Sequence, residues 1–290
     1  MGSDRTDRLV DRHDLLLLDL DGVVYVGPEA VPGAPDHLSA AREAGVRLAF
    51  VTNNAGRTPE EVAAHLTSLG VAADPGDVVT SAQAAARILA ERLGPGARVF
   101  LLGSPALARA LTEEGLVPVD AIEDDPQAVA SGYGPDVAWR TILAGASLVA
   151  QGTPWVACNA DLTFPLPTGL APGHGALVDM ISRFSGATPL VAGKPGPRLF
   201  DEAVRRMGAV APLVVGDRLD TDIAGAHAAN LPSLLVLTGV TDRAVAAAAG
   251  PDEWPTYVAD DLSALLSRGL HPQAPPGATP GGADRDTVEP

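Results

Sequence analysis

Short apolar runs that end in polar residues constrain the fold of this chain more than any other feature. Leu15–Leu20 is such a run, with Asp19 and Asp21 at its end. Val46–Thr52 has the same form and is followed by two asparagines. Apolar runs of this length without alternation are typical of strands that are buried on both faces. The pattern therefore predicts a mostly parallel sheet with helices on both sides.

Helical signals lie between these runs. Thr58 is expected to cap a helix that has Pro59 at its first position, Glu61 completing a capping box and Gly70 at its end. Alternating strands and helices predict an α/β fold with a mostly parallel sheet. Further strands are expected at Val99–Leu102, Leu213–Val215 and Leu234–Leu237, and an alanine-rich helix at Asp222–Ala229.

The charge of the chain limits its partners. Its 36 acidic and 20 basic residues give a net charge of −16, which disfavours binding to nucleic acid or to an anionic membrane. The polar segment Met1–Arg12 lacks the features of a secretory signal, and one cysteine, Cys158, cannot form an intrachain disulfide. We therefore expect a cytoplasmic protein that binds neither nucleic acid nor membrane.

Four polar clusters follow apolar runs, at places where the strands of the sheet would end. In open parallel sheets, ligands bind beyond the carboxyl ends of the strands, where such clusters meet. Each cluster alone is a common turn, but the four together supply carboxylates, a hydroxyl group, a lysine and glycines. That set suits a hard divalent cation and a phosphate group. The clusters are Asp19-Leu20-Asp21-Gly22, Thr52-Asn53-Asn54, Gly193-Lys194-Pro195 and Gly216–Asp222.

These four clusters, in this order, resemble the motifs of the haloacid dehalogenase superfamily of phosphohydrolases. The long gap between Thr52 and Lys194 resembles the subclass with a large α/β cap between the second and third motifs, which includes 4-nitrophenyl phosphatases and nucleotide monophosphatases. The likeness is strongest to actinobacterial glycerol-3-phosphate phosphatases, over Val78–Ala86 and Val214–Val240. It implies a Rossmann-like parallel-sheet core with an inserted α/β cap, and a Mg²⁺-dependent phosphatase that forms an aspartyl-phosphate.

The resemblance also implies the roles of the first cluster. Asp19 is expected to attack phosphorus and to bind Mg²⁺. Asp21 is expected to bind the metal through its backbone carbonyl, to protonate the leaving oxygen and then to deprotonate water. Dehalogenases of the same superfamily lack an acid–base aspartate at this spacing, so Asp21 favours phosphate transfer.

The other three clusters receive roles in the same way. Thr52 and Asn53 are expected to hydrogen-bond the phosphoryl oxygens, and Lys194 is expected to neutralise charge on that group and on the nucleophile. Asp217 would be a further carboxylate ligand of Mg²⁺. Asp222 would lie beside the metal and support its ligands rather than bind it directly.

The likeness divides the chain into a core, a cap and a tail. The core is expected at residues 1–80 and 187–270, the cap at 81–186, and a disordered tail rich in proline and glycine at 271–290. In the cap, Asn159, Asp161 and Phe164 occupy the place of the family's substrate-recognition loop. The alternative, that these three residues only shape a turn, has nearly equal weight.

The expected partner is a small phosphorylated metabolite, with a homodimer left open. Glycerol 3-phosphate ranks first as substrate, because Asn159 and Asp161 could bond the hydroxyls of a small polyol. Phosphoglycolate, pyridoxal phosphate, a nucleoside monophosphate or a sugar phosphate are the alternatives, since Phe164 could stack on a ring. A catalytically silent relative that binds a phosphate ligand is the non-enzyme alternative.

Overall fold

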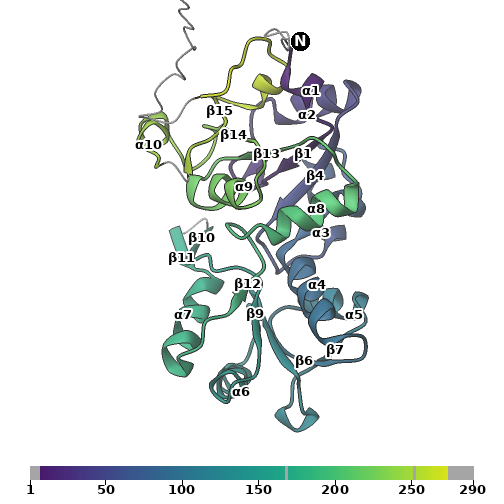
Figure 1. Cartoon of the computed structure of the whole chain (residues 1–290), viewed down its shortest axis with the longest axis vertical. Helices are drawn as coiled ribbons and strands as arrows, with labels where there is room; N and C mark the ends of the chain where they lie inside the picture. The colour runs from purple at the N-terminus through teal and green to yellow at the C-terminus, as the bar shows by residue number, and fades with distance from the viewer. Residues whose placement is uncertain (1–6, 167–168, 251–252, 274–290) are drawn as a thin grey trace, which may run out of the picture.

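The computed structural model describes residues 7–166, 169–250 and 253–273. Most of its strands form two parallel sheets, which lie in the upper and lower halves of Figure 1. The upper sheet has six strands in the order β15-β14-β13-β1-β4-β5. These strands are β1 (Leu15–Leu18), β4 (Arg47–Thr52), β5 (Val78–Thr80), β13 (Pro212–Gly216), β14 (Ser233–Val236) and β15 (Tyr257–Ala259).

Strand β1 lies at the centre of the six-stranded sheet, as its continuous apolar sequence predicts. Leu15 and Leu17 pack into one hydrophobic cluster, whereas the leucines between and after them pack into another, so both faces of the strand are buried. Leu18 pairs with Phe50 of β4 and with Val215 of β13. The three strands therefore end at the same edge, and their following loops meet there.

Helices cover the six-stranded sheet. The predicted capping box of α3 is confirmed, because Thr58 accepts a hydrogen bond from the Glu61 N–H at 3.3 Å and Pro59 is the first helical residue. The helices of this half are α1 (Leu9–Arg12), α2 (Ala34–Glu43), α3 (Pro59–Ser68), α8 (Arg198–Met207), α9 (Ala224–Ala228) and α10 (Arg243–Ala247). A short π-helical turn, η3 (Leu219–Ile223), precedes α9.

The lower sheet is also parallel and has five strands in the order β12-β9-β8-β6-β7. Its strands are β6 (Arg98–Leu102), β7 (Val117–Val119), β8 (Ala128–Ser131), β9 (Trp155–Ala157) and β12 (Leu190–Val191). Its helices are α4 (Ser81–Leu93), α5 (Pro105–Glu113), α6 (Trp139–Ala150) and α7 (His174–Ser185). The chain between β5 and α8 thus builds a second α/β layer system, inserted into the first.

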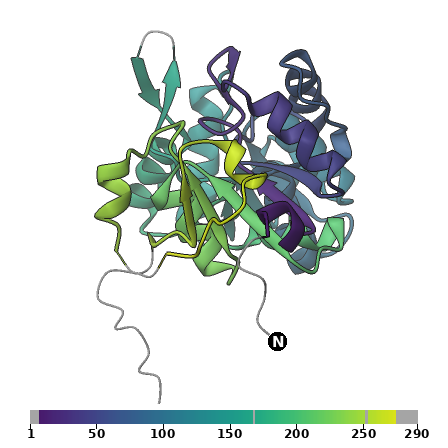
Figure 2. The same cartoon turned by 90° about the horizontal axis from the view of Figure 1, so that it is seen from above.

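Two hairpins complete the architecture. β2 (Tyr25–Val26) and β3 (Glu29–Ala30) form one antiparallel pair, and β10 (Thr163–Leu166) and β11 (Gly169–Pro172) form the other. Figure 2 shows the β10–β11 hairpin standing out from the body of the molecule. Short 3-10 turns lie at Pro75–Asp77, Ile122–Asp124 and Leu262–Leu265.

Helix α4 joins the two sheets. Its buried alanines belong to one hydrophobic cluster that includes Leu17 of the upper sheet and Val99 and Val156 of the lower sheet. Apolar burial of this kind contributes on the order of 25 cal/mol per Å² to stability. The two halves therefore share a hydrophobic contact. No helix of the described residues is both long and apolar enough to cross a lipid bilayer.

The last described residue, Gln273, is attached to the upper half. Its N–H donates to the Thr256 carbonyl at 2.9 Å, and its own carbonyl accepts from the Trp254 indole N–H at 3.2 Å. The tail expected at 271–290 is therefore hydrogen-bonded to the upper half at Gln273. Residues 274–290 lie outside the described part of the chain.

We expect a truncation after Gln273 to change the melting temperature by less than about 2 °C, because the removed sequence has little apolar surface. Deleting residues 271–290 instead removes two hydrogen bonds and should lower the melting temperature by about 2–5 °C. Thermal unfolding of both truncated proteins measures the difference. Equal melting temperatures would contradict the contribution of Gln273.

Candidate active site

Lys194 lies at the centre of the predicted site. It is the single lysine of the chain, and its side chain is 3% exposed. Its ammonium group donates hydrogen bonds to the carboxylate of Asp19 and, at 2.6 Å, to Oδ1 of Asp222. A longer contact of 3.4 Å reaches the carbonyl of Val51 at the end of β4. The nitrogen atom of Lys194 therefore joins its own cluster to those of Asp19 and Asp222. It also contacts β4, the strand that leads into the Thr52 cluster.

The charges in this cluster do not balance. Burial by itself lowers the pKa of Lys194, but Asp19 and Asp222 outweigh burial and hold that pKa above its usual value. Burial raises the pKa of Asp19 well above its usual value, Lys194 opposes this, and the neighbouring Asp222 and Asp217 raise it further. Lys194 thus bonds two of the three neighbouring carboxyl groups, Asp19 and Asp222, and a single ammonium group serves a cluster of three acidic residues.

Asp217 has an unused ligand atom. Its Oδ2 accepts a hydrogen bond from the Val240 N–H at 2.7 Å, whereas its buried Oδ1 has no hydrogen-bond partner among the described residues. Burial, followed by the charge of Asp222, raises the pKa of Asp217 to about 6. Oxygen atoms of Asp19, Asp217 and Asp222 all lie within 4.8 Å of one another. A buried orphan oxygen beside other carboxylates fits a hard divalent cation.

Gly22 allows the first cluster to approach Asp217. Its φ angle is +85°, and a Cβ atom added there would lie 2.5 Å from Oδ2 of Asp217. Glycine alone satisfies both the backbone conformation and the close approach. The neighbouring Asp21 is exposed, so its side chain is open to exchange a proton with a bound molecule.

Thr52 ends strand β4, and Asn53 follows it beside Lys194. Thr52 is 4% exposed, and its hydroxyl oxygen accepts from the Asn54 N–H at 3.1 Å, which leaves the hydroxyl proton to be donated elsewhere. The Asn53 amide bonds the backbone of Lys194 on both sides and also the carboxylate of Asp161. Thr52 therefore lies at the carboxyl end of β4, where its binding of a phosphoryl oxygen stays a prediction, and the Asn53 side chain has partners within the protein.

Comparisons with known proteins agree with this geometry. Two family models match the chain, "haloacid dehalogenase-like hydrolase" over residues 16–117 and a second haloacid dehalogenase hydrolase-like model over residues 191–265. D-Glycerol 3-phosphate phosphatase of Mycobacterium tuberculosis is 49% identical over 257 residues, which are 89% of this chain and 72% of that protein. The chain belongs to the haloacid dehalogenase-like hydrolases. The family resemblance predicted from the four clusters is thereby confirmed.

Other members of the family agree in sequence and in fold. Acid sugar phosphatase of Staphylococcus saprophyticus is 34% identical over 255 residues, covering 86% of this hydrolase and 95% of that protein. The crystal structure of M. tuberculosis glycerol phosphate phosphatase in complex with magnesium matches with a TM-score of 0.86 at 49% identity, covering 89% of this chain and 78% of that chain. The structure of 4-nitrophenylphosphatase from Thermotoga maritima matches with a TM-score of 0.82 at 30% identity, covering 89% and 98%. These matches confirm the predicted parallel-sheet α/β core with a cap.

The predicted cap loop of this hydrolase lies next to the core cluster. Asn159 is 4% exposed, and its amide donates to the Asn53 carbonyl at 2.7 Å and accepts from the Asp161 N–H at 3.2 Å. Its polar atoms are thus bonded within the protein, as the turn-shaping alternative expects. The substrate-recognition roles of Asn159, Asp161 and Phe164 stay predictions.

Sequence reasoning missed one residue of the cap, Tyr133. Its ring packs edge-to-face on Phe164 with centroids 5.3 Å apart, and a Cβ at Gly56 would lie 3.0 Å from it. Tyr133 therefore lies between the core loop after β4 and the β10–β11 hairpin. The available signal was an aromatic residue flanked by two glycines directly after the buried strand β8.

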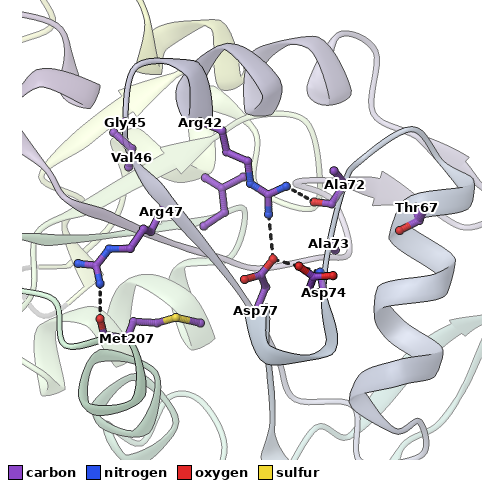
Figure 3. A pocket seen from close by; sticks show the side chains of 11 residues that line it. Arg42, Gly45, Val46, Arg47, Thr67, Ala72, Ala73, Asp74, Asp77 and Met207 are labelled. Carbon is purple, nitrogen blue, oxygen red and sulfur yellow. Dashed lines mark hydrogen bonds and ion pairs between the residues drawn. The ribbon is translucent and has the colours of Figure 1, made fainter.

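A cavity of about 600 Å³ lies elsewhere in the hydrolase, at the amino end of β4 (Figure 3). Two arginines line it, but their guanidinium groups already have partners. Arg42 donates to Asp77 at 2.9 Å and to the Ala72 carbonyl, and Arg47 bonds the Met207 carbonyl. The cavity is therefore separate from the carboxyl-end cluster and lacks its chemistry.

Proposed function

We propose that this hydrolase is a Mg²⁺-dependent phosphatase that releases phosphate from small phosphate monoesters through a phosphorylated Asp19. The observation that carries the proposal is the buried Lys194 ammonium group between Asp19 and Asp222, with the orphan oxygen of Asp217 beside them. The relatives named as phosphatases support the same activity.

The residues of the chain divide the reaction between them. A carboxylate oxygen of Asp19 attacks phosphorus, a bond from that oxygen to phosphorus forms, and the bond from phosphorus to the ester oxygen breaks. Asp21 gives its proton to the departing oxygen. Asp21 then takes a proton from water, whose oxygen attacks the same phosphorus and restores Asp19 with release of inorganic phosphate. Thr52 donates its hydroxyl proton to a phosphoryl oxygen, and Lys194 holds Asp19 in place.

The donor set suits Mg²⁺. Oxygen atoms of Asp19 and Asp217 would hold the ion, with the backbone carbonyl of Asp21 as the ligand implied by the family. Both carboxylate oxygens of Asp222 already accept hydrogen bonds, from Lys194 and from the Arg218 N–H at 3.2 Å, which supports a place beside the metal. Bound Mg²⁺ supplies positive charge that offsets the repulsion between a carboxylate and a phosphate dianion.

We also propose a slightly longer cap than the sequence suggests. Core boundaries at residues 1–80 and 187–270 would place β12 in the core, but β12 pairs with β9 of the five-stranded sheet. A cap that runs from Ser81 to Val191 keeps that sheet together. Cytoplasmic location and assembly as a homodimer remain predictions.

Chelation is expected to abolish phosphate release, and added Mg²⁺ to restore it. Asp217→Asn removes one charged ligand and should raise the Mg²⁺ concentration for half-maximal activity by at least roughly 10- to 100-fold, the loss typical of changing a residue that only supports a ligand. Ca²⁺ should bind but fail to restore turnover, because its looser coordination misplaces Asp19. Titrations of the stripped enzyme with each ion measure these effects. Full activity after exhaustive chelation would contradict metal dependence.

Glycerol 3-phosphate is expected to have the highest kcat/KM among common phosphate monoesters. The 49% identical relative named for this substrate supports the ranking, and the Phe164 ring already has an aromatic partner in Tyr133. The panel should include phosphoglycolate, pyridoxal phosphate, a nucleoside monophosphate and a sugar phosphate. The acid sugar phosphatase relatives make sugar phosphate the main competitor.

The same panel tests the two levels of the proposal separately. A higher kcat/KM for any competitor would overturn the substrate ranking and leave the phosphatase intact. No release of phosphate from any compound, including 4-nitrophenyl phosphate, would favour the silent relative that only binds a phosphate ligand.

A further inference from the structure

Asn53 holds the backbone of Lys194 at two points. Its Oδ1 accepts from the Lys194 N–H at 2.8 Å, and its Nδ2 donates to the Lys194 carbonyl at 3.1 Å. The approach is so close that a Cβ at Gly193 would collide with Oδ1 of Asn53. The Asn53 side chain therefore bonds both backbone groups of Lys194, as a neighbouring strand would. It fixes the position of the Lys194 backbone, from which the side chain extends to Asp19.

The second N–H of the same amide points to the cap. Nδ2 of Asn53 lies 3.2 Å from both carboxylate oxygens of Asp161, which is 108 residues away in the sequence. An asparagine amide has two N–H donors, and here one serves Lys194 and the other Asp161. No N–H of this side chain is then left for a phosphoryl oxygen.

The backbone of Asn53 is bonded to the cap half as well. Its carbonyl accepts from Ser81 Oγ at 2.6 Å and from Asn159 Nδ2 at 2.7 Å. The Asn159 carbonyl in turn contacts Nδ1 of the buried His174 at 2.8 Å. The loop that carries Asp161 is thus bonded to Asn53, at the end of β4, through both Asn159 and Asp161.

We propose that Asn53 is a positioning residue, which fixes Lys194 and couples it to the cap through Asp161, and is not a ligand of the phosphoryl group. We call Asn53, Asp161 and Lys194 the Asn53 junction. The inference rests on the proposed phosphatase activity and adds that the cap loop controls the lysine of the site. A change at Asp161 therefore reaches Lys194 without any contact between Asp161 and substrate.

The test exchanges donor and acceptor across the junction. In Asn53→Asp, the new carboxylate faces the carboxylate of Asp161 and has no N–H for the Lys194 carbonyl. In the double variant Asn53→Asp, Asp161→Asn, the new amide at 161 can donate to the new carboxylate at 53. Both single variants and the double variant are measured with 4-nitrophenyl phosphate, for kcat and KM separately, and by thermal unfolding.

Asn53→Asp is expected to lower kcat roughly 10- to 100-fold, as for the loss of a buried hydrogen bond to a charged group, and to lower the melting temperature. The double variant should recover at least about tenfold in kcat over Asn53→Asp and part of the melting temperature, which is non-additivity between contacting residues. A ligand of the phosphoryl group would behave differently. A carboxylate at 53 would then repel the phosphate dianion and raise KM, whatever stands at 161.

Asn54→Asp is the matched control. It makes the same chemical change one residue along, at an exposed side chain whose Oδ1 accepts from the Gly56 N–H at 2.8 Å, a bond that aspartate keeps. Asp161→Asn should not restore any loss in this control. A double variant no better than Asn53→Asp, in both kcat and melting temperature, would overturn the proposal, as would wild-type kcat in Asn53→Asp.

The two readouts separate this inference from the proposed function. Wild-type protein without phosphatase activity would contradict the proposed function. The melting temperatures of the wild type, the two single variants and the double variant would still decide whether residues 53 and 161 are coupled. Active wild-type enzyme with strictly additive effects would end the inference alone.

Discussion

Replacing Asp19 with asparagine is expected to lower kcat by at least about 10³-fold while the protein stays folded. The amide has the size of the carboxylate and its Oδ1 can still accept the hydrogen bond from Lys194. It is neither a nucleophile nor an anionic ligand, so both the attack on phosphorus and the binding of the cation are lost. Steady-state kinetics with 4-nitrophenyl phosphate and thermal unfolding measure the two parts of this prediction.

Asp36→Asn on the exposed surface of α2 is the control for the Asp19 variant. It removes one negative charge without touching the cluster around Lys194, and it should keep wild-type kcat. A folded Asp19→Asn protein that releases phosphate at the wild-type rate would refute the covalent route.

Replacing Lys194 with methionine is expected to damage both catalysis and stability. The carboxylates of the largely buried Asp19 and the fully buried Asp222 would then face each other without the ammonium group that now binds both. Removing one partner of a buried ionic cluster typically costs about 3–5 kcal/mol in the free energy of unfolding. We expect kcat to fall by at least about 10²-fold, since Asp19 loses its orientation and the phosphoryl group loses a cation.

A second change separates these two effects. In Lys194→Met, Asp222→Asn, one of the unpaired carboxylates is gone, so urea unfolding should recover part of the lost stability. Catalysis should not recover, because no cation is restored beside Asp19. Stability of Lys194→Met within about 1 kcal/mol of wild type would contradict the argument from buried charge.

The catalytic half of the molecule could be predicted from sequence because its signals are local. The leucines of β1 and the apolar run of β4 indicate buried parallel strands, and polar residues at their ends mark the site. The capping box at Thr58 is also local, and it starts α3 where expected. Each of these features depends on residues within one turn or one strand.

The partners of the cap loop could not be predicted in the same way. The bond between Asn53 and Asp161 joins residues 108 positions apart, and no pattern near either residue specifies the other. Tyr133 reaches Phe164 only because the five-stranded sheet brings β8 and the β10–β11 hairpin to the same side of the core. Such contacts follow from how the two sheets are joined, which is set by the packing of α4 rather than by any short motif.

The single lysine has a practical consequence for chemical labelling. Acylating reagents that react with primary amines have only one side-chain target in this protein, and that target is 3% exposed and held by two carboxylates. Proteases that cleave after lysine face the same barrier, and Pro195 follows the only site. Acylation of the Lys194 side chain therefore measures how often the active centre opens to solvent, without a background from surface lysines.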